Sequence, residues 1–223
     1  MTLTAADGLN LLAWHVPAPA GRSTILYTHG NGGHIGYRAE RAGILSAAGY
    51  GVLLLEYRGY GGNPGAPSEE GFHADAEAGL AFLAGQGVVP GRVILYGESL
   101  GSAVAVRLAA AMAARGAPVA ALVLEAPFTS IAEVAQHHYP YVPARHLVKD
   151  RFDAVSRIAS VKTPLLVLHG ERDDVVPIGF GRALFEAAAE PKRGWFPADA
   201  DHATIFDAEA FGVVQAFLAE HVR

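Results

Sequence analysis

Hydrophobic and polar positions along the chain form two alternating kinds of segment. Short runs that are apolar throughout indicate buried strands, and longer runs with apolar residues three or four apart indicate helices. Glycine and proline punctuate the chain between these runs. We expect strands at Asn10–Val16, Ser23–Thr28, Val52–Leu55, Val93–Tyr96, Val119–Leu124, Pro164–Leu168 and Gly194–Phe196. We expect helices at Tyr37–Ala48, Glu69–Ala84, Ser99–Arg115, Ile178–Ala189 and Ala208–His221.

Strands that alternate with helices are typical of βαβ units, so the pattern predicts an α/β fold with a mostly parallel sheet and helices on both faces. No repeat, low-complexity tract or linker interrupts it, which predicts a single domain over residues 1–223. The stretch between Leu124 and Pro164 is longer than one crossover helix needs, and we expect a minimal cap at about 128–145. In such sheets functional groups follow the carboxyl ends of the strands.

Composition and charge narrow the possible functions. Of the 223 residues 51% are hydrophobic and 17% charged, which excludes an intrinsically disordered chain. The net charge is −5 and there is no block of Lys and Arg, so a nucleic-acid partner is not expected. The absence of cysteine excludes disulfides, Cys-ligated metals and a thiol nucleophile. We expect no membrane span, and Met1–Leu12 lacks the layout of a signal peptide.

A candidate nucleophile follows the strand at Val93–Tyr96. The sequence there is Gly97-Glu98-Ser99-Leu100-Gly101, the nucleophile-elbow pattern of a strand that reverses directly into a helix. The tight turn holds Ser99 in a strained conformation with its hydroxyl at the tip, and glycines flank it because a Cβ would collide. The backbone N–H of Leu100 is then placed to donate to an oxyanion.

A glycine-rich loop follows the strand at Ser23–Thr28. Its sequence, His29-Gly30-Asn31-Gly32-Gly33, lacks the Lys-Ser/Thr of a phosphate-binding P-loop and the spacing of a dinucleotide-binding loop. We interpret it as the second arm of an oxyanion hole, with the N–H of Asn31 as donor. We expect His29 to brace this loop.

Acids and a histidine follow two later strands. Asp173 and Asp174 both lie where the acid of a Ser–Asp–His triad belongs, and His202 completes that order before the final helix. Asp199 and Asp201 are better interpreted as turn residues.

Two other features have structural interpretations beside functional ones. His137 and His138 are adjacent, so they cannot share one helix face as metal ligands do, and no metal site is expected. Phe128, Tyr139 and Tyr141 either fill the core or line an acyl pocket, and both interpretations stay open.

Taken together these motifs resemble the α/β-hydrolase superfamily. Within it the chain is similar to Bem46-type and ABHD17/ABHD13-like serine hydrolases, which are often grouped with S33 aminopeptidase-like proteins. The likeness covers nearly the whole chain and is sharpest in the His29–Gly33 loop and in Tyr57-Arg58-Gly59-Tyr60-Gly61. Other matching motifs are Asp7-Gly8-Leu9, Pro67-Ser68-Glu69, Glu125-Ala126-Pro127-Phe128, His169-Gly170 and Val176-Pro177.

The resemblance implies Ser99 as nucleophile and His202 as base, and it favours Asp173 over Asp174 as the acid. It implies a serine hydrolase that cleaves carboxylic esters or thioesters of small to medium acyl groups through an acyl-serine intermediate, without cofactor or metal. The expected partner is a small-molecule acyl ester. The physiological substrate and the oligomeric state stay open.

Two departures and two alternatives qualify this expectation. Family members usually carry an N-terminal extension, often membrane-anchoring. This chain begins within the expected first strand, which indicates either a shortened chain or a naturally soluble, cytoplasmic one. It also lacks the cysteine-rich N-terminus of the deacylases in the group, so protein depalmitoylation is not carried over.

The alternatives are a proline-type aminopeptidase and a non-catalytic binding module of the same fold.

Overall fold

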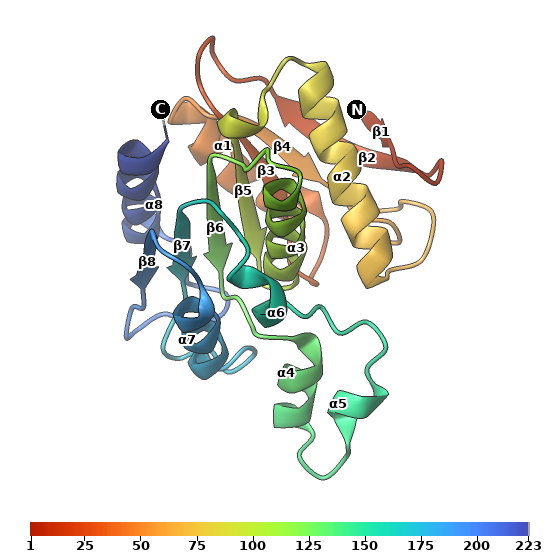
Figure 1. The fold of residues 1–223 in the computed structure, drawn as a ribbon, viewed down its shortest axis with the longest axis vertical. Helices are drawn as coiled ribbons and strands as arrows, with labels where there is room; N and C mark the ends of the chain where they lie inside the picture. Colours follow the sequence, from red (N-terminus) through yellow and green to blue (C-terminus); the bar gives the residue numbers. More distant parts are fainter. Residues whose placement is uncertain (223) are drawn as a thin grey trace.

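A single eight-stranded sheet forms the centre of the protein (Figure 1). The computed structural model describes residues 1–222. Strand order across the sheet is β1-β2-β4-β3-β5-β6-β7-β8, antiparallel from β1 to β4 and parallel from β4 to β8. The strands are β1 (Thr2–Thr4), β2 (Asn10–Val16), β3 (Thr24–Thr28), β4 (Gly51–Leu55), β5 (Val93–Glu98), β6 (Ala121–Glu125), β7 (Leu165–Leu168) and β8 (Lys192–Trp195).

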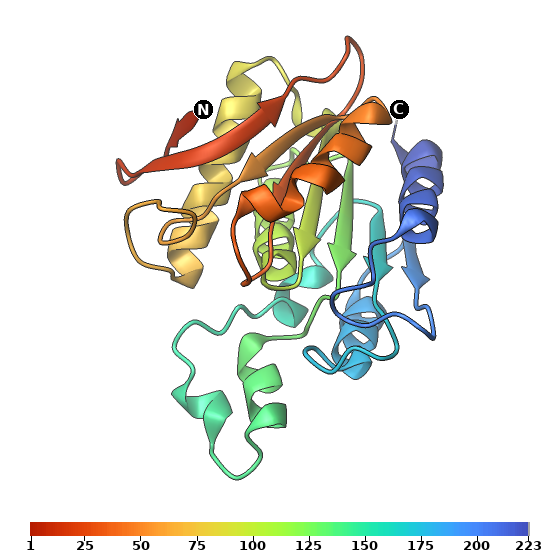
Figure 2. The same ribbon diagram turned by 180° about the vertical axis from the view of Figure 1, so that it is seen from behind.

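Helices cover both faces of the sheet because successive residues of the buried strands point to opposite sides. Leu95 belongs to one core cluster with residues of α2, α3, α6 and α7, whereas its neighbours Ile94 and Tyr96 belong to a second cluster with residues of α1 and α8 on the other face (Figures 1 and 2). These helices are α1 (Ala39–Ala47), α2 (Glu69–Gly85), α3 (Leu100–Ala114), α6 (Val155–Ile158), α7 (Ile178–Ala187) and α8 (Ala208–His221). The expected α/β class, with a mostly parallel sheet, is confirmed.

The carboxyl ends of six parallel strands meet at one edge. The pairing register sets Thr28 of β3 beside Gly97 of β5, and Glu98 beside Glu125 of β6. Leu168 of β7 lies between Glu125 and Trp195 of β8. Loops that leave these ends are therefore neighbours in space although up to about 170 residues separate them in the chain.

Between β6 and β7 the chain projects away from the sheet. This segment holds α4 (Ile131–His138) and α5 (Ala144–Leu147), which extend from the body, and then α6, whose Ile158 packs in the core (Figures 1 and 2). Ser130 begins α4 as its N-cap, since its hydroxyl accepts from the N–H of Glu133 at 3.2 Å. α4 and the start of α5 lie within residues 128–145, and the role of this segment as a cap stays a prediction.

Most expected elements lie within a few residues of the observed ones, and Ser68 caps α2 as expected, accepting from the N–H of Gly71 at 3.0 Å. The expected ranges did not include β1, the 3-10 helices η1 (Ile35–Arg38) and η2 (Pro90–Arg92), or the short helices α4, α5 and α6 between β6 and β7. A three-residue strand carries too few alternating positions to stand out in a sequence.

Two glycines in helices provide a matched stability test. A Cβ added at Gly101 of α3 would overlap the Thr28 carbonyl oxygen, whereas one added at Gly43 of α1 meets nothing within 4 Å. We expect Gly101→Ala to lower the free energy of unfolding by about 2 kcal/mol or more. Gly43→Ala should raise it by up to about 1 kcal/mol, because alanine favours a helix.

Urea unfolding followed by circular dichroism measures both changes. Equal effects of the two substitutions would contradict the close approach of α3 to β3.

Candidate active site

Ser99 occupies a strained elbow between β5 and α3. Its backbone dihedral angles, φ 49° and ψ −115°, lie in a region that residues other than glycine rarely adopt. The turn is anchored on both sides, since the N–H of Ser99 donates to the Glu125 carbonyl at 2.8 Å and its carbonyl accepts from Ser102 N–H at 2.9 Å. The structure therefore has the sharp strand-to-helix reversal that the motif predicts.

The glycine-rich loop after β3 lies against this elbow. A Cβ added at Gly30 would be 3.3 Å from Ser99 Cβ and 3.1 Å from Glu98 Oε1, so only glycine allows the loop to approach without displacing them. Leu100 is the first residue of α3, and its N–H has no acceptor within the helix. Asn31, Ser99 and Leu100 line one cavity, an arrangement in which two backbone donors can flank the serine.

Asp173 and His202 meet across 29 residues of sequence. His202 Nδ1 is 2.7 Å from Asp173 Oδ2. The other oxygen of Asp173 accepts from the N–H groups of Val175 at 3.0 Å and Val176 at 2.7 Å, which fixes the carboxylate. Asp174, the alternative by position, is exposed.

His202 and Ser99 line the same cavity. Within residues 1–222 no hydrogen bond joins the Ser99 hydroxyl to the imidazole. Such contacts are often longer in free enzymes and shorten when substrate binds.

Electrostatics favour a charged Asp173 and a readily protonated His202. Burial by itself would raise the pKa of Asp173, but hydrogen bonds from His169, His202 and the backbone of Val176 hold it well below its usual range. Burial by itself would lower the pKa of His202. The hydrogen bond and the charge of the Asp173 carboxylate have the larger, opposite effect, so this pKa is raised above its ordinary value. The carboxylate thus stabilises an imidazolium.

His169 is a second donor to Asp173 that the sequence interpretation did not assign. Its Nε2 lies 3.1 Å from Asp173 Oδ2 and 2.8 Å from the Val176 carbonyl oxygen. Both partners are acceptors, so Nε2 carries the proton. The signal was present in the sequence, because a histidine directly after β7 lies four residues before the acid.

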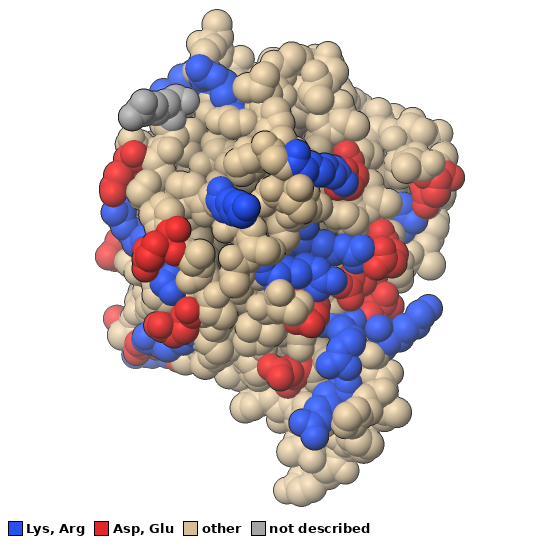
Figure 3. All heavy atoms as spheres, in the orientation of Figure 1, with Lys and Arg blue, Asp and Glu red and all other residues tan. Residues whose placement is uncertain are grey.

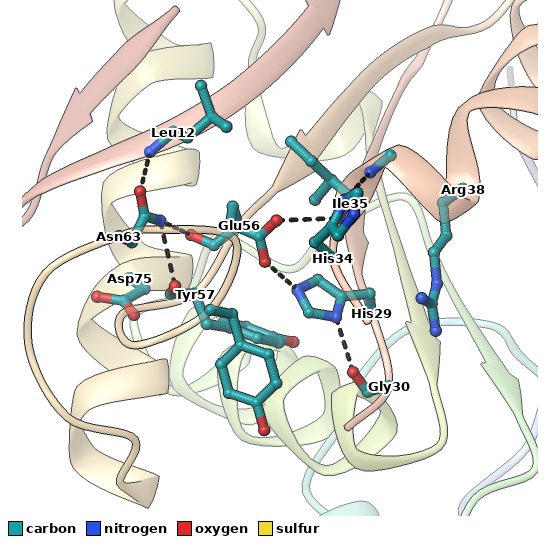
Figure 4. Close-up of polar contacts among 12 residues, drawn as sticks. Leu12, His29, Gly30, His34, Ile35, Arg38, Glu56, Tyr57, Asn63 and Asp75 are labelled. Carbon is teal, nitrogen blue, oxygen red and sulfur yellow. Dashed lines mark hydrogen bonds and ion pairs between the residues drawn. The ribbon is translucent and has the colours of Figure 1, made fainter. Parts of the chain in front are cut away.

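A buried carboxylate braces the glycine-rich loop at both ends (Figure 4). Glu56 Oε1 lies 3.0 Å from His29 Nε2, and Glu56 Oε2 accepts from the N–H of Ile35 at 2.9 Å. His29 Nδ1 also lies 2.7 Å from the Gly30 carbonyl oxygen. Neither His29 nor Glu56 is exposed to solvent. His29 therefore holds the loop in place, as its position in the sequence suggested.

Arg38 connects this loop to the elbow. Its Nη1 donates to the Gly32 carbonyl at 2.7 Å, and its Nε donates to Glu98 Oε2 at 3.0 Å, next to Ser99. The hydroxyl of Tyr27 also donates to Glu98, at 2.8 Å. Hydrogen bonds and charge from Arg38 overcome the effect of burial and lower the pKa of Glu98. One guanidinium thus fixes the loop that carries Asn31 relative to the residue before the nucleophile.

Two cavities share Ser99 in their walls. The first, about 370 Å³, has a mainly apolar lining. Its residues include Tyr60, Phe72, Leu100, Phe128, Ile131, Val134, Phe152 and Val176. The second, about 480 Å³, has a more polar lining that includes His202. It also contains Arg38, Arg41, Glu98 and Glu125. An apolar group in the first cavity and a polar group in the second would both be accommodated beside the serine.

The three aromatic residues expected near an acyl pocket lie in different environments. Phe128 is buried and lines the apolar cavity. Tyr139 and Tyr141 do not line it, and they are 64% and 100% exposed. The expectation that these two tyrosines bind substrate in the pocket is therefore corrected. They lie beyond the end of α4, which carries them away from the sheet.

Neither a metal-binding group of side chains nor a membrane-spanning helix is found in the described part of the chain. Residues 1–222 contain no group of three or more His, Asp or Glu side chains arranged to hold a metal ion. Over the same residues, no helix combines the length and apolar character that crossing a bilayer requires.

The sheet order, the strained elbow and the loops at the carboxyl edge define a protein of the α/β-hydrolase fold. Residues 19–151 match the family described as serine aminopeptidase, S33. That match covers more than half of the chain, which therefore belongs to this family. The finer likeness to Bem46-type and ABHD17/ABHD13-like proteins stays a prediction.

Curated relatives are longer than this chain. It is 50% identical over 190 residues to an uncharacterised protein of Mycobacterium tuberculosis strain H37Rv, covering 84% of this chain and 66% of that one. It is 34% identical over 224 residues to the lysophosphatidylserine lipase ABHD12 of Danio rerio, covering 85% of this chain and 58% of that one. The chain thus spans about two thirds or less of the length of these relatives.

Solved structures share the fold. The esterase Pf2001 of Pyrococcus furiosus has a TM-score of 0.77 at 21% identity, covering 100% of this chain and 90% of that one. The esterase RhEst1 of Rhodococcus sp. ECU1013 has a TM-score of 0.75 at 19% identity, covering 99% of this chain and 98% of that one. At such identities the likeness concerns the fold alone.

The contact between Asp173 and His202 makes a testable prediction about titration. We expect the pKa of His202 to lie above the ordinary 6.5, and to fall in the Asp173→Asn variant because the amide no longer stabilises the imidazolium. NMR titration of the histidine ring signals measures both values. An unchanged pKa in the folded variant would contradict the pairing. Asp174→Asn serves as the matched control and should leave the pKa of His202 nearly unchanged.

Proposed function

We propose that this protein is a serine hydrolase that cleaves carboxylic ester or thioester bonds of small to medium acyl substrates. The observation that carries the proposal is the paired Asp173 carboxylate and His202 imidazole on a cavity that also contains Ser99 on its strained elbow. A hydroxyl, an imidazole and an oriented carboxylate are the three groups that acyl transfer through serine requires.

In the proposed reaction, His202 accepts the proton of the Ser99 hydroxyl while the serine oxygen attacks the substrate carbonyl carbon. Asp173 holds the imidazole in the required tautomer and stabilises its positive charge. The backbone N–H groups of Asn31 and Leu100 donate to the oxyanion, each lowering the barrier by about 3 kcal/mol. The tetrahedral adduct collapses to an acyl-Ser99, and the leaving alcohol or thiol departs with the proton from His202. Water, deprotonated by His202, then releases the acid.

The two cavities suggest which part of the substrate lies where. His202 protonates the leaving group, so that group belongs in the polar cavity that His202 lines. The acyl chain then extends into the apolar cavity between Leu100, Phe128 and Val134. An apolar acyl group gains about 0.8 kcal/mol for each methylene it buries there.

Esters are favoured over peptides by two considerations. ABHD12, one of the relatives above, is described as a lysophosphatidylserine lipase. The S33 aminopeptidase family name supports the competing assignment, an aminopeptidase. Such an enzyme needs acidic groups to bind the free amine of a peptide. Among the described residues that line the apolar cavity Asp150 is the one acid, and its Oδ1 already accepts from the N–H of Glu69 at 2.8 Å.

Labelling and turnover together test the assignment. A fluorophosphonate should modify Ser99 in the folded protein, and p-nitrophenyl esters should be hydrolysed much faster than amino-acid anilides. Ser99→Ala should abolish labelling and lower kcat by at least about 10⁴-fold, whereas the exposed Ser160→Ala should match the parent.

Two other results would point elsewhere. Faster cleavage of anilides would identify an aminopeptidase. A folded protein that neither labels nor turns over any substrate would identify a non-catalytic binding module.

Acyl-chain length should depend on the apolar cavity. We expect Val134→Trp, which fills space beside Phe128, to lower kcat/KM for octanoyl esters by about tenfold or more while acetyl esters react nearly as before. Val155→Trp, at a half-exposed site of α6 outside the cavity, is the control. Equal losses on short and long esters would place the acyl chain elsewhere.

A further inference from the structure

The end of the projecting segment carries an unusual concentration of exposed apolar side chains. We define the cap tip as residues 137–149, from the end of α4 through α5 to Lys149. Tyr139, Tyr141, Val142 and Leu147 are 64%, 100%, 45% and 70% exposed. Exposed apolar residues that stand alone are ordinary, but a cluster at the end of a projection indicates an interaction surface.

The backbone of the tip is held in place although its apolar side chains face solvent. The side-chain amide of Gln136 donates to the Val142 carbonyl at 2.9 Å and to the Tyr139 carbonyl at 3.3 Å. Nη1 of Arg151 donates to the Arg145 carbonyl at 3.0 Å. These contacts satisfy polar backbone groups of the turn from within the segment, so its apolar side chains are presented outward by an organised loop.

Charge is distributed unevenly around this tip. Residues 134–149 contain Arg145 and Lys149 and no acid, whereas the whole chain has a net charge of −5. Arg151 lies against the same loop, and Figure 3 shows blue side chains along the lower projection with a tan end. The nearest acids in sequence are Glu133 and Asp150, and they are engaged with Thr129 and with the N–H of Glu69.

The tip also lies next to the wall of the apolar cavity. Ile131 and Val134 of α4 line that cavity, and the last two residues of the same helix, His137 and His138, begin the tip. His138 Nε2 lies 2.9 Å from the carbonyl oxygen of Val175, another residue of the cavity wall. Val134 and His137 are three residues apart on α4, a rise of about 4.5 Å, so the tip begins close to the cavity wall.

We propose that the cap tip docks onto an anionic lipid surface. Tyrosine side chains with an apolar ring and a polar hydroxyl suit the boundary between lipid headgroups and acyl chains. Cationic side chains beside them are attracted by anionic headgroups. Docking of this kind would bring lipid-borne esters to the apolar cavity, and this consequence alone rests on the proposed function.

A second copy of the chain is a less suitable occupant. In a symmetric dimer through the tip, Arg145 and Lys149 of one copy would approach their own equivalents, with no acid in residues 134–149 to neutralise them. Phosphatidylglycerol or phosphatidylserine headgroups supply that missing negative charge.

Sedimentation with vesicles tests the docking directly. The full chain should bind vesicles of phosphatidylcholine containing about one third phosphatidylglycerol, and salt should weaken this binding by screening. The double variant Tyr141→Ser/Leu147→Ser should bind at least about tenfold more weakly, because two apolar side chains no longer leave water. Arg145→Gln/Lys149→Gln should bind weaker by about fivefold per charge removed.

Matched controls test whether binding depends on the tip itself or on any exposed aromatic side chain or positive charge. Trp14→Ser removes an exposed aromatic side chain on β2, away from the projection (Figure 2), and should bind like the parent. Lys162→Gln/Arg172→Gln removes the same net charge from exposed sites and should lose much less affinity than the tip pair. Ser99→Ala should bind normally, so a failure of docking is distinguishable from a failure of the proposed chemistry.

Three results would overturn the proposal. The first is no binding to anionic vesicles. The second is equal binding by the tip variants and their controls. The third is self-association in sedimentation velocity that the tip variants abolish while vesicle binding stays unchanged, because the tip would then join two copies of the chain.

Discussion

Everything at the candidate site depends on how closely the chain turns from β5 into α3. Gly97 and Gly101 leave no room for a Cβ, since the first would meet the backbone of α3 and the second the end of β3. This contact keeps Ser99 in its strained conformation and sets the start of α3 beside the glycine-rich loop. A wider turn would separate the hydroxyl of Ser99 from both backbone donors at once.

Buried polar contacts then fix the loops around this turn. Glu56 holds both ends of the glycine-rich loop, and Arg38 joins that loop to Glu98 beside the nucleophile. On the other side, Asp173 receives two backbone N–H groups and two imidazoles. Loops that would otherwise be mobile are thereby held with the precision that a reaction at one atom needs. The polar groups are costly to bury unless all are paired, which explains why they form networks.

Much of the fold and of the candidate site could be predicted because the relevant signals are local. Fully apolar runs identified the parallel strands, and glycines at fixed offsets from Ser99 identified the elbow. Asp173 and Asp174 could not be separated by position alone. The structure distinguishes them because Asp173 turns inward to the N–H groups of Val175 and Val176, whereas Asp174 is exposed.

What the sequence could not predict depends on contacts between distant residues or on direction in space. Arg38 and Glu98 are 60 residues apart, and no local pattern connects them. Tyr139 and Tyr141 lie in an aromatic stretch that suits a pocket wall, but α4 carries them outward. Hydrophobic character alone does not say whether a side chain faces a cavity or the solvent.

A crystal structure of the protein after reaction with a phosphonate ester tests the account most directly. We expect phosphorus bonded to the Ser99 oxygen, with one phosphonate oxygen about 2.7–3.1 Å from the backbone nitrogens of both Asn31 and Leu100. The imidazole of His202 should face the leaving-group side, still bonded to Asp173. An adduct on another residue, or an oxyanion that contacts neither nitrogen, would contradict the account.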